Sequence, residues 1–305
     1  MQHLLTLNDL TTNDLKTILN LAADLKKRYL AGERPALYPG HVLALLFEKQ
    51  SLRTRVSFEA GMAHLGGGSL MLGEDTGFGS TREAMCDFAA VLTEMVDLVV
   101  LRTKKHATVE EFAKYSSVPV INGLTDFSHP CQAITDLFTA SEVFGNLQGR
   151  KIAWIGDANN VARSLAMAAG MLGMEMTLAA PEDYQFSDEE LDWINANSAG
   201  MQLEMTDNPA AAAIDASVIY TDVWVSMGQE KEKEQRKKAF ADYQVTSELM
   251  KLAEKKAIFM HCLPANRGEE VTDEVIDSPA SVVVQQAGNR MHAQKGILAW
   301  LFDQE

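Results

Sequence analysis

The side chains of this chain that could do chemistry gather in five short polar clusters. The first, Ser51-Leu52-Arg53-Thr54-Arg55, offers two guanidiniums and two hydroxyls within five residues. It follows an apolar run over 42–47 and precedes a helical pattern over 56–65, so we expect a buried strand before it and a helix after it. Unpaired N–H groups of a first helical turn, together with planar guanidiniums, suit a phosphate. The alternative is a solvated turn whose Ser or Thr only caps the helix.

The other four clusters also fall at or after expected strand ends. They are Arg102 after the apolar run 98–101, His129-Pro130-Cys131-Gln132 at a helix start, Asp222–Met227 after 218–220, and His261-Cys262-Leu263-Pro264 after 257–260. Ligands of open parallel sheets bind at the carboxyl ends of the strands. Five polar clusters at such positions therefore predict an active site.

Each cluster also has a purely structural interpretation. His129 could be a helix cap, and Arg102 could be a surface residue with an ion partner. Cys262 could be a small buried side chain, the usual place of a free Cys. It cannot pair directly with His261 as in a Cys–His protease, because neighbours in a strand point to opposite faces. The segment 156–160 lacks the G-x-G-x-x-G pattern, so it only weakly indicates a dinucleotide site.

Strands and helices alternate along the whole chain, which predicts an α/β protein with parallel sheets flanked by helices. A length of 305 residues fits two domains of roughly 150 residues each. We expect a first domain over 1–132 and a second over 133–288, joined by interdomain helices. We also expect a short strand over 282–284, a helix over 290–301, and a C-terminal segment 289–305 that packs back on the first domain.

Composition limits the classes of partner. The formal net charge is -15 and no long Lys/Arg tract occurs, which argues against a nucleic acid or an anionic membrane. Three cysteines without a C-x-x-C pair predict neither a disulfide framework nor a four-ligand zinc site. No apolar run reaches the roughly 18 residues of a membrane span, and no signal-peptide pattern opens the sequence. We therefore expect a cytoplasmic protein.

Taken in order, the clusters resemble the aspartate/ornithine carbamoyltransferase family over nearly the whole chain. The family motif S-T-R-T-R is similar to residues 51–55, and H-P-x-Q matches residues 129–132. The ornithine branch carries D-x-x-x-S-M-G and H-C-L-P, which match 222–228 and 261–264. Leu52 departs from the pattern, where Thr is usual. A Leu at this position also resembles acetylated-ornithine transcarbamylases, so it bears on substrate choice.

The resemblance implies transfer of a carbamoyl group from carbamoyl phosphate to the δ-amine of ornithine, without a metal or organic cofactor. It implies catalytic roles for Arg102, His129 and Cys262. Carbamoyl phosphate would be bound by Ser51, Leu52, Arg53, Thr54, Arg102, His129, Gln132, Cys262, Leu263 and Arg290. Ornithine would be bound by Asn160, Asp222, Ser226 and Met227. The first domain would then bind carbamoyl phosphate and the second ornithine.

The resemblance further implies a homotrimer or a multiple of trimers. It leaves other amines open as substrates: N-acetylornithine, putrescine or aspartate. Aspartate fits least, because the S-M-G and H-C-L-P motifs are absent from that branch. A catalytically silent binding or regulatory subunit is the alternative outside the enzymes. The presence of Arg53, Arg102, His129 and Arg290 argues against it.

Overall fold

The chain divides into two compact units, each of which contains one sheet. A computed structural model describes residues 2–73, 78, 83–198, 200–225 and 229–303. Unit 1 comprises Met1–Phe138 and Gly288–Glu305, and unit 2 comprises Thr139–Ala287. The domain boundary expected at residue 132 and the division after Phe138 both fall on one helix, α5 (Pro130–Phe144). Among the described helices, none has both the length and the apolar character needed to cross a bilayer.

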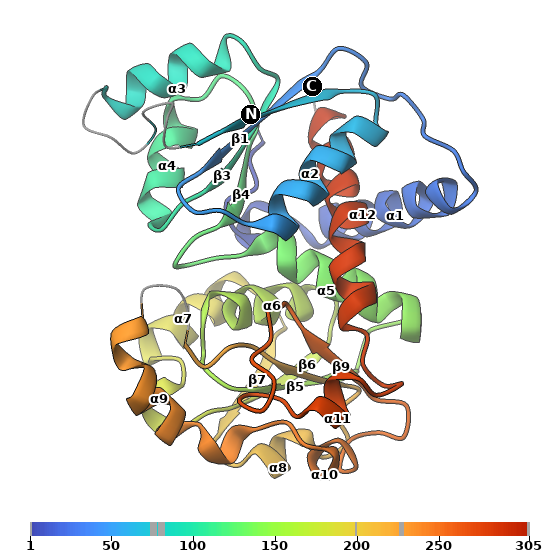
Figure 1. Ribbon diagram of the computed structural model, residues 1–305, viewed down its shortest axis with the longest axis vertical. Helices are drawn as coiled ribbons and strands as arrows, with labels where there is room; N and C mark the ends of the chain where they lie inside the picture. Colours follow the sequence, from blue (N-terminus) through green and yellow to red (C-terminus); the bar gives the residue numbers. More distant parts are fainter. Residues whose placement is uncertain (1, 74–77, 79–82, 199, 226–228, 304–305) are drawn as a thin grey trace. The chain divides into compact units, whose positions relative to one another are not determined.

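The sheet of unit 1 has four parallel strands in the order β2-β1-β3-β4 (Figure 1). They are β1 (Val42–Phe47), β2 (Gly68–Leu72), β3 (Leu98–Arg102) and β4 (Val120–Leu124). The runs of β-branched and leucine side chains in β1 and β3 are typical of strands buried on both faces. The predicted parallel α/β fold is confirmed. The strand order reverses between β1 and β3, because β2 lies on one side of β1 and β3 on the other.

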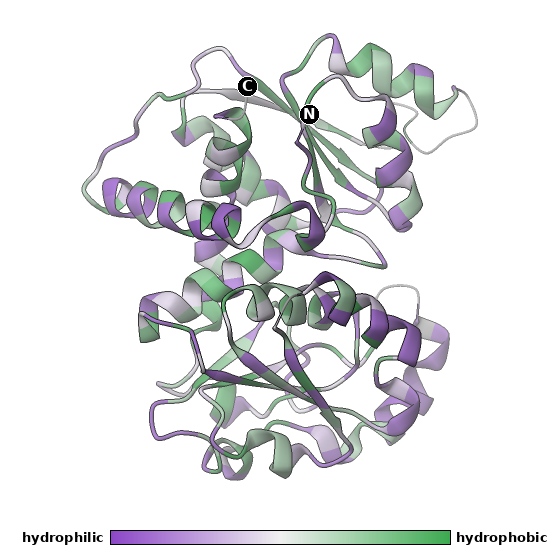
Figure 2. Ribbon diagram, turned by 180° about the vertical axis from the view of Figure 1, so that it is seen from behind, coloured by the Kyte–Doolittle hydropathy of each residue, from purple (hydrophilic) through white to green (hydrophobic). Residues whose placement is uncertain are grey.

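Helices cover both faces of this sheet (Figure 1). One face carries α3 (Met85–Thr93) and α4 (His106–Tyr115), and the other carries α1 (Thr12–Leu30), α2 (Leu52–His64) and α12 (Val283–Phe302). Figure 2 shows a hydrophilic outer side on α1, whose Leu15, Ile18, Ala22 and Leu25 are buried. Gly296 lets α12 approach α1 closely, since a Cβ there would lie 2.6 Å from the carbonyl oxygen of Ile18.

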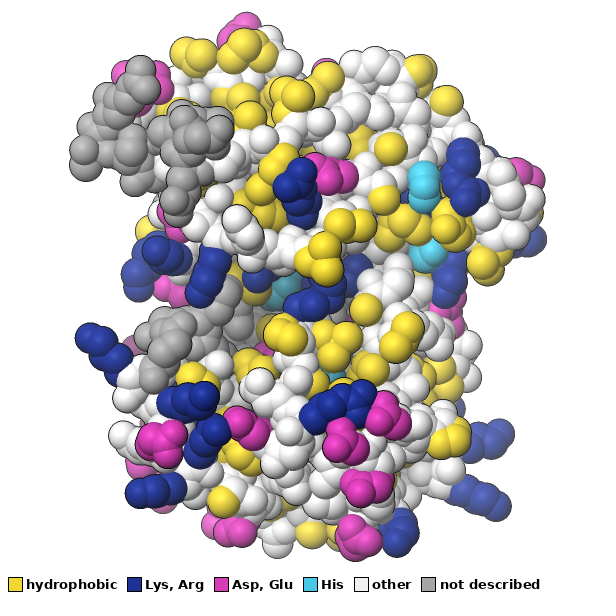
Figure 3. Space-filling model, viewed as in Figure 1, with side chains coloured by type: hydrophobic (Ala, Val, Ile, Leu, Met, Phe, Trp, Pro, Cys, Tyr) yellow, Lys and Arg dark blue, Asp and Glu magenta, His cyan; other side chains and the backbone are white. Residues whose placement is uncertain are grey.

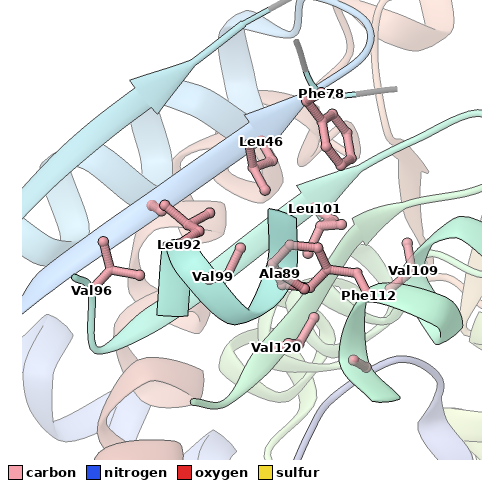
Figure 4. Close-up of a cluster of buried hydrophobic side chains, with 12 residues drawn as sticks. Leu46, Phe78, Ala89, Leu92, Val96, Val99, Leu101, Val109, Phe112 and Val120 are labelled. Atoms are coloured by element: carbon pink, nitrogen blue, oxygen red, sulfur yellow. The ribbon is translucent and has the colours of Figure 1, made fainter. Parts of the chain in front are cut away.

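A hydrophobic core fills the space between the sheet and the α3–α4 layer (Figure 4). Alternate residues of a strand point to the same face, so Ala44 and Leu46 of β1 lie beside Val99 and Leu101 of β3. Helices α3 and α4 contribute Ala89, Leu92, Val109, Phe112 and Ala113. This packing fixes the ends of β1 and β3, which carry the first two polar clusters.

Unit 2 has five parallel strands in the order β7-β6-β5-β8-β9. They are β5 (Lys151–Ile155), β6 (Glu175–Ala179), β7 (Gln202–Thr206), β8 (Val218–Thr221) and β9 (Ile258–His261). The order reverses between β5 and β8. The sequence analysis did not predict β7, because this edge strand has few apolar residues and an exposed alternation.

The helices of unit 2 lie on both faces of its sheet (Figure 1). They are α6 (Asn160–Met171), α7 (Asp188–Asn197), α8 (Pro209–Ala213), α9 (Lys233–Ala239), α10 (Ser247–Met250) and α11 (Asp273–Ile276). Short 3-10 turns occur at Leu7–Asp9, Glu182–Tyr184, Glu230–Glu232 and Ala241–Tyr243. Basic and acidic side chains are mixed over the face of unit 2 that Figure 3 shows. Arg267, for example, bonds Asp273 and Asp277 at 2.7 Å.

The C-terminal segment differs from its prediction. The expected strand over 282–284 is wrong, because α12 already begins at Val283 instead of near residue 289 or 290. The extended pairing stops one residue earlier. Ser281 forms an isolated parallel bridge with Phe259, and the N–H of Val282 donates to the carbonyl of Phe259 at 3.0 Å. The β-branched residues Val283 and Val284 instead form the first turn of α12. Val283 is buried in this turn, whereas Val284 is 81% exposed.

Candidate functional sites at the two switch points

Both sheets place polar clusters where their strand order reverses. In unit 1, β1 leads into residues 51–55 and β3 ends at Arg102, so these clusters flank the reversal between the two strands. In unit 2, β5 leads into residues 156–160 and β8 leads into Asp222. Ligands of doubly wound sheets bind in the crevice at such switch points, outside the carboxyl ends of the strands. Each unit therefore has a candidate ligand site of its own.

The first turn of α2 forms the floor of the unit 1 site. Ser51 caps the helix, and its Oγ accepts from the N–H of Thr54 at 3.5 Å. The N–H groups of residues 52 and 53 belong to the first helical turn, which has no intrahelical acceptors to offer them. Leu52 is 76% exposed, so the residue that departs from the family motif offers this site its backbone rather than its side chain.

The two guanidiniums of the motif behave differently. Arg55 bonds both carboxylate oxygens of Glu59 at 3.2 Å, one turn along the helix, and is about half exposed. Such an i,i+4 pair is an ordinary feature of a solvated helix face. Arg53 is partly buried at the start of the helix. Only Arg53 thus remains from this motif as a candidate cation for the site.

Thr54 lies at the centre of the unit 1 cluster. Its Oγ1 accepts from Nη1 of Arg102 at 3.0 Å and from Nη2 of Arg290 at 3.2 Å, and its exposed fraction is 1%. The hydroxyl of Ser51 also donates to this oxygen, at 3.1 Å. Three donors thus converge on Oγ1, and the hydroxyl proton of Thr54 is left to donate to an anion in the site. This brings together residues from α2, β3 and α12 that are far apart in the sequence.

Gln132 is held at both ends of its amide. Its Oε1 accepts from Nη1 of Arg290, and its Nε2 donates to Oδ1 of Asp136 at 2.8 Å. Both partners are buried in unit 1. The sequence analysis missed Asp136. The i,i+4 spacing of Gln132 and Asp136 on one helix was the available signal.

His129 immediately precedes α5 and is 4% exposed. Burial lowers the pKa of its imidazole well below the ordinary value, and the charges of Arg290 and Arg102 lower it further. The ring is therefore neutral at neutral pH and donates from one nitrogen only. A neutral donor beside two fixed guanidiniums can bind a carbonyl oxygen that gains negative charge.

In unit 2, Asn159 and Asp222 connect the two loops at the switch point. Oδ1 of Asn159 caps α6 by accepting from the N–H groups of residues 161 and 162. Its Nδ2 donates to Oδ2 of Asp222 at 2.8 Å. The predicted residue, Asn160, is the first residue of α6. Ser226 and Met227 lie outside the described residues.

Cys262 and Leu263 follow β9, the neighbour of β8. Sγ of Cys262 donates to Oδ1 of Asp222 at 3.0 Å. Leu263 has a left-handed backbone, with φ 59°, and its N–H donates to Nδ1 of His261 at 2.8 Å. Since Nδ1 accepts, the His261 proton lies on Nε2, which donates to the buried carboxylate of Glu270 at 3.1 Å. His261 thus fixes the backbone of the loop at Leu263, while Cys262 contacts the carboxylate of Asp222.

Three residues of this region carry atoms that commonly coordinate metal ions. Asp222, His261 and Cys262 each offer one ligand atom, and these atoms lie within 4.8 Å of one another. Cys262 already donates to Asp222, and Nδ1 of His261 already accepts from Leu263. Each of the three groups therefore already has a hydrogen-bond partner in this arrangement. None of the three cysteines, all in the described part of the chain, forms a disulfide.

These features define a class of protein: two parallel α/β units, each with a candidate ligand site at its switch point, one rich in guanidiniums and one centred on a carboxylate. Family models assign the chain more specifically. The model of the aspartate/ornithine carbamoyltransferase carbamoyl-P binding domain matches residues 2–142. That of the Asp/Orn binding domain matches residues 148–301. The chain belongs to the aspartate/ornithine carbamoyltransferase family.

Individual relatives agree with this assignment. An ornithine carbamoyltransferase of Caldicellulosiruptor saccharolyticus is 50% identical over 306 residues, which cover 99% of this chain and 98% of the relative. The structure of ornithine carbamoyltransferase from Pyrococcus furiosus superposes with a TM-score of 0.95 at 48% identity, covering 99% of this chain and 97% of that one. An acetylornithine transcarbamylase complexed with acetylcitrulline reaches a TM-score of 0.87 at 31% identity, covering 99% of both chains.

Proposed function

We propose that this protein transfers the carbamoyl group of carbamoyl phosphate to the δ-amine of L-ornithine, giving L-citrulline and phosphate. The main support is the cluster of Thr54, Arg102 and Arg290 at the switch point of unit 1, in a chain of this family. Relatives named for ornithine are about half identical to it over nearly their whole length, whereas the acetylornithine enzyme shares 31%. Ornithine is therefore the preferred acceptor, and N-acetylornithine and putrescine are the alternatives.

Unit 1 binds carbamoyl phosphate. The phosphate lies at the start of α2, which Ser51 caps, and is bound by the N–H of Leu52, the hydroxyls of Ser51 and Thr54, and the guanidinium of Arg53. Arg290, which reaches Thr54 from α12, adds a second cation. Charge-assisted bonds of this kind are about twice as strong as neutral ones, and the helix N-terminus favours an anion. The same contacts stabilise the phosphate as it leaves.

The carbonyl oxygen of the carbamoyl group is bound by Arg102, His129 and Thr54. When the amine attacks, the carbon becomes tetrahedral and this oxygen gains negative charge, which fixed donors stabilise without reorganising. One acceptor position of the Gln132 carbonyl takes Arg290, and the second accepts from the carbamoyl nitrogen. The C–N bond forms in this addition, the tetrahedral intermediate then expels phosphate by breaking the C–O bond, and the nitrogen loses one proton to the departing phosphate or to solvent.

Unit 2 binds ornithine. The carboxylate of Asp222 pairs with the α-ammonium, and Asn160 at the start of α6 bonds the α-carboxylate. By the family resemblance, Ser226 and Met227 complete this site. Cys262 and Leu263 lie at the reacting end, where Cys262 contacts Asp222 at 3.0 Å. No metal or organic cofactor takes part, because orientation and electrostatics suffice for this acyl transfer.

A citrulline colour assay tests the proposal. The purified protein is incubated with carbamoyl phosphate and, in separate reactions, ornithine, N-acetylornithine, putrescine or aspartate. We expect turnover with ornithine at the highest kcat/KM. A higher kcat/KM with another amine would assign the protein to that acceptor. Absence of phosphate release with all four amines would support a catalytically silent subunit.

We also propose that the protein is a homotrimer or a multiple of trimers. The support in this chain is a set of exposed hydrophobic side chains on unit 1: Leu52 is 76%, Val56 50% and Leu70 48% exposed. Leu52 and Val56 are four residues apart on α2 and so share one face. Exposed apolar residues of this kind suit an interface between subunits. The loop 73–81, which we expect to reach a neighbouring subunit, lies largely outside the described residues. Light scattering that finds an active monomer would contradict this proposal.

We also propose that the protein is located in the cytoplasm. Three thiols without a disulfide fit a reducing compartment. Both substrates are small molecules, and a formal charge of -15 disfavours nucleic acid as a partner. Cell fractionation with an antibody against the protein tests the location, and recovery outside the cytoplasmic fraction would contradict it.

A further inference from the structure

One buried arginine of unit 2 has no role in the function proposed above. Arg236 lies on α9 and is 7% exposed. Its guanidinium lies 4.9 Å from the ring centre of Tyr184, and Nε bonds Glu232 at 2.9 Å. A buried arginine loses its hydration, and a buried ion pair is weak evidence for added stability.

The remaining contacts of Arg236 reach both loops of the switch point. Nη1 lies 3.1 Å from Oδ2 of Asp157, in the loop after β5. The same nitrogen donates to the backbone carbonyl of Trp224 at 3.2 Å, in the loop after β8. Asp157 is two residues before Asn159, which caps α6, and Trp224 is two residues after Asp222. One guanidinium group thus spans the two segments that carry the proposed ornithine ligands.

The loops are also fixed individually at these points. The indole N–H of Trp154 donates to the carbonyl of Asp157 at 3.0 Å, and the ring of Trp224 stacks on Phe240 with an interplanar angle of 16°. Arg236 joins these two anchored segments to each other. Asn159 makes the second connection between the loops by its bond to Asp222. Among the described residues, Arg236 is thus one of the polar links that set the distance between the loops, beside Asn159 and the hydroxyl of Thr221, which donates to the carbonyl of Ile155.

Charge gives Arg236 a second effect on the site. Burial raises the pKa of Asp157, and the nearby Asp222 raises it further, whereas Arg236 lowers it. Asp157 and Asp222 repel each other when both are ionised. Arg236 pairs with both Asp157 and Glu232, so its charge offsets part of this repulsion beside the site proposed for a cationic ligand. A neutral side chain at position 236 would remove the link and this compensation together.

We propose that Arg236 is a positioning residue for the amino-acid end of ornithine. It holds the loops after β5 and β8 at a fixed separation. This inference rests on the proposed function. It predicts that loss of Arg236 weakens binding of the α-amino-acid group and leaves the binding of carbamoyl phosphate in unit 1 unchanged.

The experiment compares Arg236→Gln, Arg236→Lys and Asp157→Asn with the unaltered protein. We expect Arg236→Gln to raise the KM for ornithine roughly 10- to 100-fold, since small displacements of ligand groups have effects of that size. The KM for carbamoyl phosphate should change less than about two-fold. Arg236→Lys should recover part of the loss, because an ammonium keeps the charge but lacks the planar fork that reaches two partners. Asp157→Asn should fall between Arg236→Gln and the unaltered protein.

Norvaline, which has the α-amino-acid group of ornithine but no δ-amine, isolates the binding step. Its inhibition constant should rise in Arg236→Gln by about the same factor as the KM for ornithine. Arg163→Gln is the matched control, because Arg163 is 6% exposed, lies in the same unit and pairs with Glu190 on α7. We expect this control to lower the Tm without a selective change for ornithine.

Three results would overturn the inference. In the first, Arg236→Gln lowers the Tm, but its inhibition by norvaline and its KM for ornithine equal those of Arg163→Gln. Arg236 would then have only a structural role. Another is an equal change in the KM of both substrates. The third applies if Arg236→Gln does not fold: unaltered norvaline binding in both Arg236→Lys and Asp157→Asn would then contradict the inference. Failure of the proposed function would be distinct, because the unaltered protein would then form no citrulline from ornithine.

Discussion

Nη1 of Arg102 donates a 3.0 Å hydrogen bond to Oγ1 of Thr54, which joins the end of β3 to the first turn of α2. The two residues are 48 positions apart, and neither belongs to the other's sequence motif. Because Arg290 donates to the same oxygen, one buried hydroxyl orients two guanidiniums.

Thr54→Val keeps the shape of the side chain but removes the acceptor of both guanidiniums. We expect kcat/KM for carbamoyl phosphate to fall roughly 10- to 100-fold, since hydrogen bonds to charged groups contribute about 1.5–3 kcal/mol. Steady-state kinetics of citrulline formation measure this loss. Ser57→Ala is the control, because Ser57 is buried one turn along α2 and its hydroxyl bonds the carbonyls of residues 53 and 54. Equal losses in the two variants would contradict a specific role for Thr54.

Arg53→Ala should remove most activity and leave the fold intact. The guanidinium lies at a helix N-terminus where we place the phosphate, and one charge-assisted bond there contributes about 1.5–3 kcal/mol. The neighbouring Arg55→Ala should retain nearly full activity, since Arg55 pairs with Glu59 on the exposed face. Kinetics and circular dichroism of both variants check this. Near-normal use of carbamoyl phosphate by Arg53→Ala would contradict the phosphate assignment.

Leu52→Thr should leave the reaction type unchanged and alter the affinity for carbamoyl phosphate only modestly. The side chain is 76% exposed, so the backbone N–H supplies the contact at this position. A new hydroxyl would add at most one neutral hydrogen bond of about 0.5–1.5 kcal/mol. The KM for carbamoyl phosphate and the kcat/KM for each amine are the measurements. A change in the preferred amine would show that Leu52 sets specificity.

Asp222→Asn should weaken the use of ornithine more than the use of N-acetylornithine. The carboxylate can pair with an α-ammonium, which acetylation removes, so only ornithine loses an ion pair in this variant. The unaltered protein should prefer ornithine over N-acetylornithine, which would leave the acid unpaired, and over putrescine, which keeps a second ammonium but lacks the α-carboxylate. The ratio of kcat/KM values for the amines, measured in both proteins, tests this. An unchanged ratio would remove Asp222 from the ornithine site.

Lys295→Met should raise the Tm at pH 7. Lys295 is buried on α12, its Nζ donates to the carbonyl of Leu25 at 3.2 Å, and burial lowers its pKa from 10.5 to about 8. The folded protein thus binds this proton less tightly than the unfolded chain, so the lysine destabilises the fold fully below pH 8. The cost declines as pH rises from 8 to 10.5 and is absent above that range.

Thermal unfolding from pH 7 to pH 10.5 measures this effect. The difference in Tm between Lys295→Met and the unaltered protein should shrink across that range. Lys27→Met, at an exposed position of α1, is the control and should show little change at any pH. A Tm difference that grows with pH would contradict the lowered pKa.

The sequence alone determined the elements and the chemical groups. The apolar runs over 42–47, 98–101, 218–220 and 257–260 located β1, β3, β8 and β9, because a buried strand has a strong local pattern. The missed strand, β7, lies at an edge and is half exposed, so its pattern is weak. The start of α12 was also misplaced, because three β-branched residues favour a strand locally while the packing of Val283 favours a helix.

Only the tertiary structure decided how the groups combine. Strand order is a long-range property, so no local pattern could show that residues 51–55 and Arg102 share one switch point, or that 156–160 and Asp222 share another. The fold also separated Arg53 from Arg55, although the two are alike in sequence, because helical geometry directs Arg55 toward Glu59. Asp136 and Arg236 gain their significance from the partners that packing gives them. Residue types set the available chemistry, and the strand order and packing selected which residues act together.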